Sequence, residues 1–141
     1  MEIPTPPCRL THSLDIQSRF GDFDAFAHVN NNAYLQYYDL GKARFLSDLL
    51  GHICSPSELG AVIVNINCNF FAPSLMNEPL AVQTGCLKLG DRSFTLFQQI
   101  VNPQTGSVKG NATTVLAGFD IATQSSAPIP AALSAALRTL L

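Results

Sequence analysis

Charge is the scarcest feature of this sequence. Asp, Glu, Lys and Arg make up 13% of the 141 residues and leave a formal net charge of −2 at pH 7. Soluble domains usually carry about 25% of these residues. Because large exposed apolar patches usually mark interfaces, so little charge favours a surface that is partly covered by another subunit. A surface made polar by Asn, Gln, Ser and Thr is the alternative.

Signals for nucleic acid and for membranes are also missing. The net charge is −2 and no cluster of basic residues is present, so no nucleic-acid partner is expected. No apolar run reaches the roughly 18–20 residues of a membrane-spanning helix. The first residues lack the basic and apolar parts of a signal peptide. We therefore expect no membrane partner and a cytoplasmic location.

Common catalytic and metal motifs are absent as well. The sequence has no Gly-rich phosphate loop, no Gly-x-Ser-x-Gly elbow and no His-Glu-x-x-His pair. The cysteines show no close-pair spacing, so no metal site is predicted. Four free thiols are a simpler expectation than disulfides in a cytosolic chain. These cysteines are Cys8, Cys54, Cys68 and Cys86.

The periodic segments predict a single α+β domain over residues 1–141. Residues 8–20 alternate between apolar and polar side chains, as a strand does. A helical pattern then begins at Asn30, a preferred N-cap, and Gly51 is its stop signal. The apolar face of this helix holds Tyr34, Tyr37, Tyr38, Gly41, Phe45 and Leu49, whereas Gln36, Asp39, Lys42, Ser47 and Asp48 lie largely elsewhere on the wheel.

Four further strands are expected after the helix, over residues 62–70, 80–89, 93–102 and 107–121. Turn residues at 90–92 and 102–106 predict hairpins, which make neighbouring strands antiparallel, so these strands should form a meander. Residues 51–60 are expected to be a loop and residues 1–7 a loose tail. Residues 123–141 are expected to be a C-terminal tail that can form one short helix.

The strand over residues 62–70 has an unusual polar face. Asn is depleted in strands, yet three asparagines alternate here with apolar residues. Water, a polar ligand or a neighbouring subunit is expected to cover them. The apolar face holds Val62, Val64, Ile66, Cys68 and Phe70, and the other face holds Asn65, Asn67 and Asn69.

The helix must bury its apolar face, and the concave face of the sheet is the only large partner available. The predicted fold class is therefore α+β, with one long central helix wrapped by a five-stranded antiparallel sheet.

The chemistry concentrates just before the helix. Asp24 precedes the expected N-cap by six residues. The start of a helix carries unpaired N–H groups that can stabilise an oxyanion. A carboxylate beside it can attack a carbonyl or activate a water, and together these groups suit acyl transfer or hydrolysis. The alternative is an Asp that caps the helix or lies in a solvated loop.

The neighbours of Asp24 divide into expected supports and expected structural residues. Asp22 lies two residues away and should point to the opposite face of an extended backbone, so we interpret it as a turn residue. His28 is either structural or a support for the site. One of the three asparagines at 30–32 is enough to cap the helix, and a second can bond a substrate carbonyl or an attacking water.

These residues carry a resemblance to a known family. The run from Asp22 to Asn31, DFDAFAHVNN, resembles the D-x-D-x-x-x-H-V-N-N signature of hotdog-fold acyl-CoA thioesterases of the 4-hydroxybenzoyl-CoA thioesterase family. The resemblance covers about residues 9–122. Weaker likenesses to the family lie in Tyr34, Tyr38, Ala43 and Arg44 on the helix, and in residues 70–73 and 78–80 between the second and third strands.

The resemblance implies a hotdog fold and the hydrolysis of an acyl thioester of coenzyme A or of a carrier protein. No cofactor is implied, since coenzyme A is part of the substrate. Asp24 would be the nucleophile or the general base, the backbone N–H of Asn31 the oxyanion donor, and His28 or Asn30 a support. The residues expected to bind substrate are Asn30, Tyr34, Phe70, Phe71 and Pro73, and the candidates for the CoA phosphates are Lys88, Arg92 and Lys109.

The resemblance also implies an assembly. Members of the family pair into dimers with active sites at the subunit interface, and the dimers often stack, so we expect a homodimer and a homotetramer built from it. Two other functions stay open at this point. One is a non-catalytic module that binds acyl thioesters or acyl-carrier protein, and the other is a dehydratase of hydroxyacyl thioesters.

Overall fold

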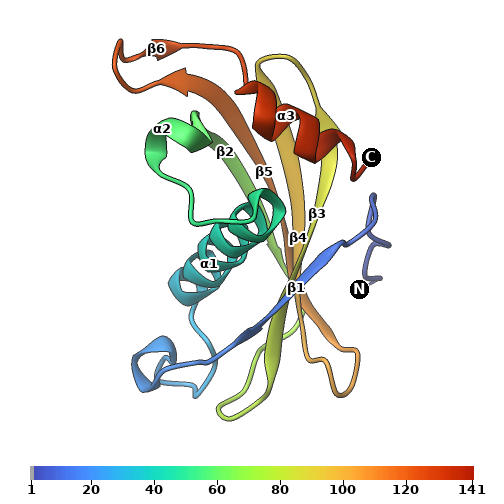
Figure 1. Ribbon diagram of the computed structural model, residues 1–141. Coiled ribbons are helices and arrows are strands. Elements are labelled where there is room, and N and C mark those ends of the chain that lie inside the picture. The colour runs from blue at the N-terminus through green and yellow to red at the C-terminus, as the bar shows by residue number, and fades with distance from the viewer. Residues whose placement is uncertain (1) are drawn as a thin grey trace.

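A 20-residue helix, α1 (Asn31–Leu50), lies in the concave face of a curled antiparallel sheet (Figure 1). The computed structural model describes residues 2–141. Both caps of α1 match the sequence prediction, because Asn30 is the N-cap and Gly51, at φ 82°, is the C-cap. The helix inside a curled sheet confirms the predicted α+β hotdog architecture.

Five strands form the body of the sheet. They are β1 (His12–Ile16), β2 (Ala61–Phe70), β3 (Leu80–Leu89), β4 (Ser93–Val101) and β5 (Val108–Asp120). Their order is β1-β3-β4-β5-β2, and every pairing is antiparallel. The predicted four-strand meander is therefore wrong for β2, which pairs with β5 rather than with β3. The loop over residues 71–79 carries the chain from one edge strand, β2, into the middle of the sheet.

Four short elements complete the described residues, 2–141. The predicted loop at 51–60 contains a helical turn, α2 (Pro56–Leu59), and a 3-10 turn, η1 (Phe20–Asp22), precedes the long helix. The predicted C-terminal helix is present as α3 (Ala131–Arg138), and a two-residue strand, β6 (Ser125–Ser126), pairs with β5. Leu133 and Leu137 of α3 are buried in the core, so this end of the chain is more than a tail.

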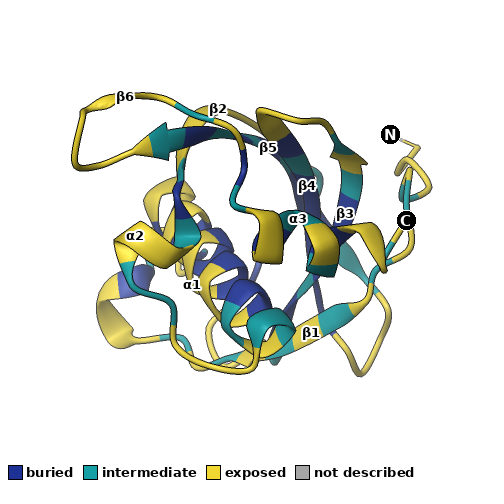
Figure 2. Cartoon of the chain, turned by 45° about the horizontal axis from the view of Figure 1, so that its top comes forward, coloured by how far each residue is buried: buried dark blue, intermediate teal, exposed yellow. Residues whose placement is uncertain are grey.

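The helix packs on the sheet at very short range around Gly41. A Cβ at Gly41 would lie only 2.6 Å from Val82 Cγ1 and 2.9 Å from Gln98 Nε2. The close approach lets the amide of Gln98 donate to the carbonyl of Tyr38 over 3.0 Å and to Thr84 Oγ1 over 3.1 Å. The predicted apolar face of α1 is the buried one, as its dark side toward the sheet shows (Figure 2).

Lys42 departs from the helical-wheel prediction. It was assigned to the polar side of α1, yet it is only 3% exposed. Its ammonium pairs with Asp39 over 3.3 Å and lies 3.5 Å from Gln98 Oε1. Burial lowers the pKa of Lys42, and the carboxylate of Asp39 opposes this change. A long side chain can bury its stem and still reach a polar partner, which a wheel of Cα positions does not capture.

The first strand is shorter than predicted, because it ends where its partner begins. Residues 8–20 were expected to form one strand, but β1 spans only His12–Ile16. Ile16 pairs with Leu80, the first residue of β3, and Pro79 before it has no N–H to donate. The alternation itself is confirmed, since His12, Leu14 and Ile16 are partly buried and Ser13 and Asp15 are exposed.

A bulge in β2 changes which of its side chains share a face. The register shifts between Ile63 and Asn65, so Val64 is the extra residue. As a result Ile63 faces the helix with Ile66, whereas Val62 shares the outer face with Asn65. The predicted single apolar face over residues 62–70 is therefore correct only beyond the bulge.

The asparagine face of β2 continues as a row of amides across the outer face of the sheet. Asn69 pairs in register with Asn111, Asn111 with Gln99, and Gln99 with Gln83. Asn69 Nδ2 donates to Asn111 Oδ1 over 3.0 Å, and Gln99 Nε2 donates to Gln83 Oε1 over 2.7 Å. Neighbouring amides thus satisfy part of a face for which the sequence predicted an external partner.

The remaining expectations concern the thiols, the tail and membranes. The four cysteines are all free, as predicted. Residues 2–11 form neither helix nor strand, although Thr11 N–H donates to the carbonyl of Thr84 over 3.0 Å. Within residues 2–141, no helix has both the length and the apolar character needed to cross a membrane.

Candidate active site

A cavity of about 300 Å³ opens between the start of α1 and the loop that follows β2. It contains all the residues predicted to be catalytic or to bind the acyl group except Asn30. A wider groove of about 910 Å³ lies beside α3, but we favour the smaller cavity because a carboxylate there adjoins the start of the long helix. The smaller cavity is lined by Asp24, His28, Val29, Asn31, Tyr34, Phe70, Phe71, Ala72 and Pro73.

Asp24 is held by a tight turn over residues 24–28. Its N–H donates to the carbonyl of His28 over 2.9 Å, and its own carbonyl accepts from Ala27 over 3.0 Å. The side-chain Oδ1 accepts from the N–H of Phe26 over 2.9 Å and from that of His28 over 3.3 Å. Within residues 2–141 no hydrogen bond reaches Oδ2. One carboxylate oxygen is thus fixed in place and the other is left for chemistry.

The turn also stores backbone strain. Ala27 adopts φ 57°, in the left-handed region that residues with a Cβ rarely occupy. The two N–H groups bonded to Asp24 flank this residue, so the carboxylate stabilises the strained turn that presents it.

The start of α1 separates the roles of two neighbouring asparagines. Asn30 Oδ1 accepts from the N–H of Asn32 over 2.8 Å and from that of Ala33 over 3.2 Å, which is a regular N-cap. Asn30 lies outside the cavity, in the wall of a second depression beside Asp22. Asn31 lines the cavity, and its N–H meets no acceptor among the described residues. A free N–H at a helix start can hold a negatively charged oxygen.

Tyr34 of α1 lines the cavity and contacts residues at the end of β2 and in the loop that follows it. Its hydroxyl hydrogen-bonds Ser74 Oγ over 2.5 Å, and its ring meets that of Phe70 edge-on with centroids 5.4 Å apart. Burial raises the pKa of Tyr34, and the hydrogen bond with Ser74 opposes that rise, so the hydroxyl is neutral at pH 7. The backbone adds a further tie, since Val29 N–H donates to the Ser74 carbonyl over 2.9 Å.

Asp22 has a structural role that the sequence analysis underestimated. It is 4% exposed, and its carboxylate accepts from Arg19 N–H over 2.9 Å, from the Arg19 guanidinium over 3.2 Å and from Tyr37 OH over 2.7 Å. Burial acts to raise the pKa of Asp22, but the bonds from Arg19 and Tyr37 outweigh it and hold that pKa below its usual range. Its carbonyl also accepts from Asn30 N–H over 2.9 Å.

The comparisons with known proteins agree with this geometry. The model of the thioesterase-like superfamily matches residues 18–137. The chain belongs to this superfamily. The matched stretch contains the turn at Asp24, the long helix and the loop after β2, so the candidate site lies wholly within the part of the chain that defines the family.

Individual members of the superfamily are similar over most of the chain. The long-chain acyl-CoA thioesterase FadM of Escherichia coli is 28% identical over 111 residues, which cover 77% of this chain and 83% of that protein. A thioesterase of Thermus thermophilus, solved with coenzyme A and Zn, superposes with a TM-score of 0.78 at 23% identity and covers 95% and 93% of the two chains.

A third similar protein is named for an aromatic acyl group. A 1,4-dihydroxy-2-naphthoyl-CoA thioesterase from Synechocystis superposes with a TM-score of 0.79 at 21% identity, over 91% of this chain and 96% of that one. Such structural likenesses support the hotdog fold. The narrower 4-hydroxybenzoyl-CoA thioesterase family stays a prediction.

The remaining titratable candidates lie outside the site of this superfamily member. His12 bonds Asp48 over 2.8 Å, and His52 contacts Glu58, so both act as the structural residues expected from the sequence. Throughout residues 2–141, no group of three or more His, Cys, Asp or Glu side chains is arranged to hold a metal ion.

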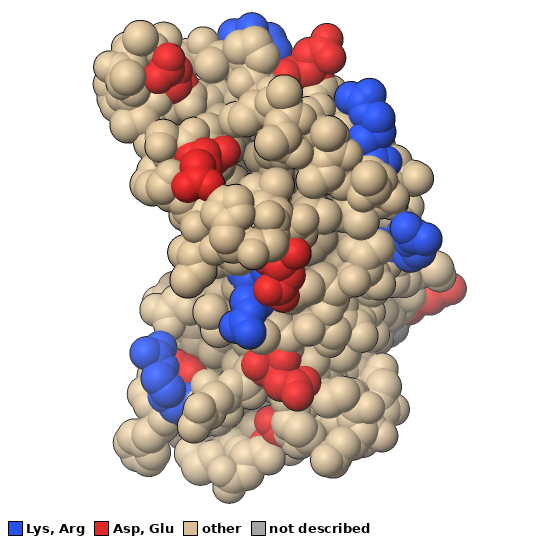
Figure 3. Space-filling model, viewed as in Figure 1, with Lys and Arg blue, Asp and Glu red and all other residues tan. Residues whose placement is uncertain are grey.

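The three candidates for CoA phosphates also lie outside the lining of the cavity. Lys109 is buried against Glu78, and Arg92 bonds Ser126 Oγ over 3.0 Å. Lys88 is exposed, at the end of β3. On the face shown in Figure 3 the basic side chains are scattered over a largely uncharged surface.

Proposed function

We propose that this chain hydrolyses acyl-CoA thioesters to a free acid and coenzyme A, with Asp24 and the N–H of Asn31 as its chemical groups. One observation carries the proposal: the half-free carboxylate of Asp24 and the unbonded N–H of Asn31 line the same cavity. Membership of the thioesterase-like superfamily supports the same reaction.

The proposed reaction begins with the thioester carbonyl at the start of α1. The N–H of Asn31 donates to the carbonyl oxygen and stabilises the negative charge that forms there upon attack. Asp24 Oδ2 either attacks the carbonyl carbon or takes a proton from an attacking water. In the first route the thiolate of CoA leaves and water hydrolyses the mixed anhydride. In the second route water adds directly and the thiolate leaves.

The other predicted residues have supporting positions in this scheme. Tyr34, Phe70, Phe71 and Pro73 give the acyl group an apolar wall, and His28 lies at the mouth beside Asp24. Asn30 contributes by capping α1, whose first N–H, that of Asn31, is the proposed oxyanion donor. It does not contact the substrate in this scheme. The scheme needs no cofactor, since coenzyme A is part of the substrate.

The proposed assembly is a homodimer, and a homotetramer formed from it, in the cytoplasm. Among residues 2–141, β2 pairs with β5 on one side and with no strand on its other edge. Unpaired strand edges favour pairing with another chain. The last residue of this strand, Phe70, lines the cavity, so a second copy on β2 would lie beside the active site. The strand is rich in exposed apolar side chains, namely Val62, Ile63, Val64, Ile66 and Phe70.

A thiol-release screen tests the proposal. The wild-type chain is mixed with aromatic and with short, medium and long aliphatic acyl-CoAs, and the free thiol is measured over time. We expect turnover with at least one class, because the apolar wall suits both. Acyl-CoA binding without thiol release in any class would contradict hydrolysis and favour a non-catalytic acyl-thioester module. Hydration of an enoyl-CoA would instead favour a dehydratase.

A further inference from the structure

An ion pair lies behind the loop that forms the wall of the cavity. Glu78, near the end of this loop, meets Lys109 of β5 with 2.8 Å between Oε2 and Nζ. The two side chains are only 14% and 8% exposed, and neither lines the cavity. The charges thus lie next to the site, largely buried, and outside the lining of the cavity.

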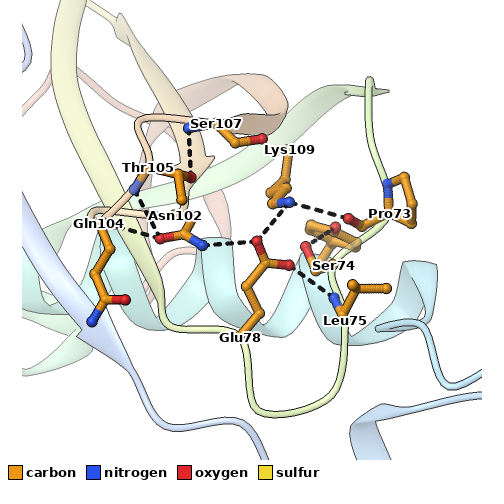
Figure 4. A network of polar contacts seen from close by, with 10 residues as sticks. Pro73, Ser74, Leu75, Glu78, Asn102, Gln104, Thr105, Ser107 and Lys109 are labelled. Carbon is orange, nitrogen blue, oxygen red and sulfur yellow. Dashed lines mark hydrogen bonds and ion pairs between the residues drawn. The ribbon is translucent and has the colours of Figure 1, made fainter.

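The free hydrogen-bonding capacity of this pair is directed at the loop backbone. Lys109 Nζ donates to the carbonyl of Pro73 over 3.2 Å. Glu78 Oε1 accepts from the N–H of Leu75 over 3.0 Å, and Asn102 Nδ2 donates to Glu78 Oε2 over 2.8 Å (Figure 4). Both side chains therefore hold residues 73–75, which carry no strand pairing of their own beyond one isolated bridge at Leu75.

The segment that the pair holds is the one that meets the active-site helix. Ser74 is fully buried, and it contacts α1 through Tyr34 OH and the preceding turn through Val29 N–H. Leu75 forms its bridge with His28. A continuous series of bonds thus connects Lys109 and Glu78 to both sides of the cavity.

Stability alone does not explain charged groups at this place. A buried ion pair often adds no more stability than apolar residues of the same volume, but it fixes geometry through directed bonds. Burial acts to raise the pKa of Glu78, and the bonds from Lys109, Leu75 and Asn102 outweigh it, so the carboxyl stays ionised at neutral pH. The charged form is the one that accepts all of these bonds.

We propose that Glu78 and Lys109 are positioning residues, whose ion pair holds residues 73–75 and so sets the part of the wall at Pro73 for the acyl group. The inference rests on the proposed hydrolysis. The pair acts through Pro73, Ser74 and Leu75 and touches no reacting atom. Its loss lets the wall move away from the acyl group while the carboxylate of Asp24 and the start of α1 stay in place.

A split between KM and kcat tests this role. A purely structural defect reduces the folded fraction, which lowers apparent kcat and leaves KM unchanged. We expect Glu78→Gln to raise KM about tenfold or more at pH 7, since a displaced wall weakens binding of the acyl group equally in the ground state and the transition state. Lys109→Met should give a similar rise, and the double variant should be no worse than either single one, because both remove the same pair.

Two variants serve as controls and one as a rescue. Glu58→Gln removes the same charge from an exposed pair with His52 and should change KM by less than about twofold. Leu137→Ala weakens the core beneath α3 and should lower stability without raising KM. Lys109→Arg retains the charge and the donors, and its KM should lie nearer to wild type than that of Lys109→Met.

The outcomes distinguish this inference from the proposed function. Unchanged KM in folded Glu78→Gln, additive losses in the double variant, or equal damage from Lys109→Arg and Lys109→Met would each overturn the positioning role alone. Should Glu78→Gln fail to fold, Glu78→Asp keeps the charge with a shorter reach and must still raise KM. A wild-type chain that releases no thiol from any acyl-CoA would overturn the function and this inference together.

Discussion

Asp22 and Asp24 stand two residues apart on one loop and have opposite surroundings. Asp22 is buried and accepts bonds from Arg19 and Tyr37 with both of its oxygens. Asp24 is exposed, and its Oδ1 accepts from two N–H groups of its own turn, while no described residue bonds its Oδ2. The extended backbone between them sends one carboxylate behind the start of α1 and the other into the cavity.

The difference shows how one short loop can hold a carboxylate that stabilises the fold and a second one that is available to a substrate. A buried carboxylate that accepts three bonds from its own chain stabilises the fold but is not accessible to a substrate. A carboxylate held by one oxygen is oriented and still reactive. Stability should therefore depend on Asp22, and rate on Asp24.

The largest expected effect is on the rate of Asp24→Asn. We expect this variant to lose at least about 100-fold in thiol-release rate, because it removes the proposed nucleophile or base. An Asn side chain still offers an oxygen to the N–H groups of Phe26 and His28, so the urea unfolding midpoint should not change. Near-normal turnover in this variant would refute the role of Asp24.

Asp22→Ala should show the reverse pattern. It leaves Tyr37 OH and the guanidinium of Arg19 without their buried partner, which should lower the free energy of unfolding by about 2–3 kcal/mol. Urea unfolding measures the loss, and Tyr37→Phe, which removes one bond, should cost about 1 kcal/mol. A variant that unfolds like wild type but has lost turnover would reverse the assignment of the two carboxylates.

The pH dependence of the unfolding free energy reports on the charge of Asp22 alone. This contribution should be no larger than the loss expected for Asp22→Ala. The pKa of Asp22 in the folded state lies below the ordinary value of 3.8 for an aspartate. A depressed pKa stabilises the fold above the unfolded pKa, and this stabilisation disappears as pH falls through the folded one. The difference in unfolding free energy between wild type and Asp22→Asn should therefore shrink as pH drops below 3.8. A difference that stays constant to lower pH would contradict it.

The smallest effects should come from the two asparagines at the start of α1. Asn30→Ala removes the cap and should lower the unfolding free energy by about 1 kcal/mol. Asn31→Ala is the matched control, and it should keep both stability and turnover, because its N–H belongs to the backbone. A large loss of rate in Asn31→Ala would show that the side chain takes part.

Local patterns were enough to predict most of the fold. The cap at Asn30 and the stop at Gly51 are interactions within one helix turn, so the residue types reveal them directly. The alternation in β1 and the turn at 90–92 are equally local. The opposite directions of Asp22 and Asp24 followed from the period of an extended backbone.

The features that the sequence did not reveal depend on distant partners. The place of β2 beside β5 is decided by pairings between residues far apart in the chain, and its bulge at Val64 by the same register. Glu78 and Lys109 form an ion pair although β3 and β4 separate them in the sequence. Neither residue is unusual alone, and the sequence pattern suggested for Lys109 only a contact with the CoA phosphates, whereas its side chain is buried.

The contact at Gly41 limits how the cavity can change size. Because no side chain fits between α1 and Val82, the middle of the helix is a fixed point on the sheet. Room for a bulkier acyl group therefore has to come from the rim, where Phe71 and Pro73 lie on a loop. Laboratory evolution toward new acyl groups should alter residues 71–75 repeatedly and leave position 41 as glycine.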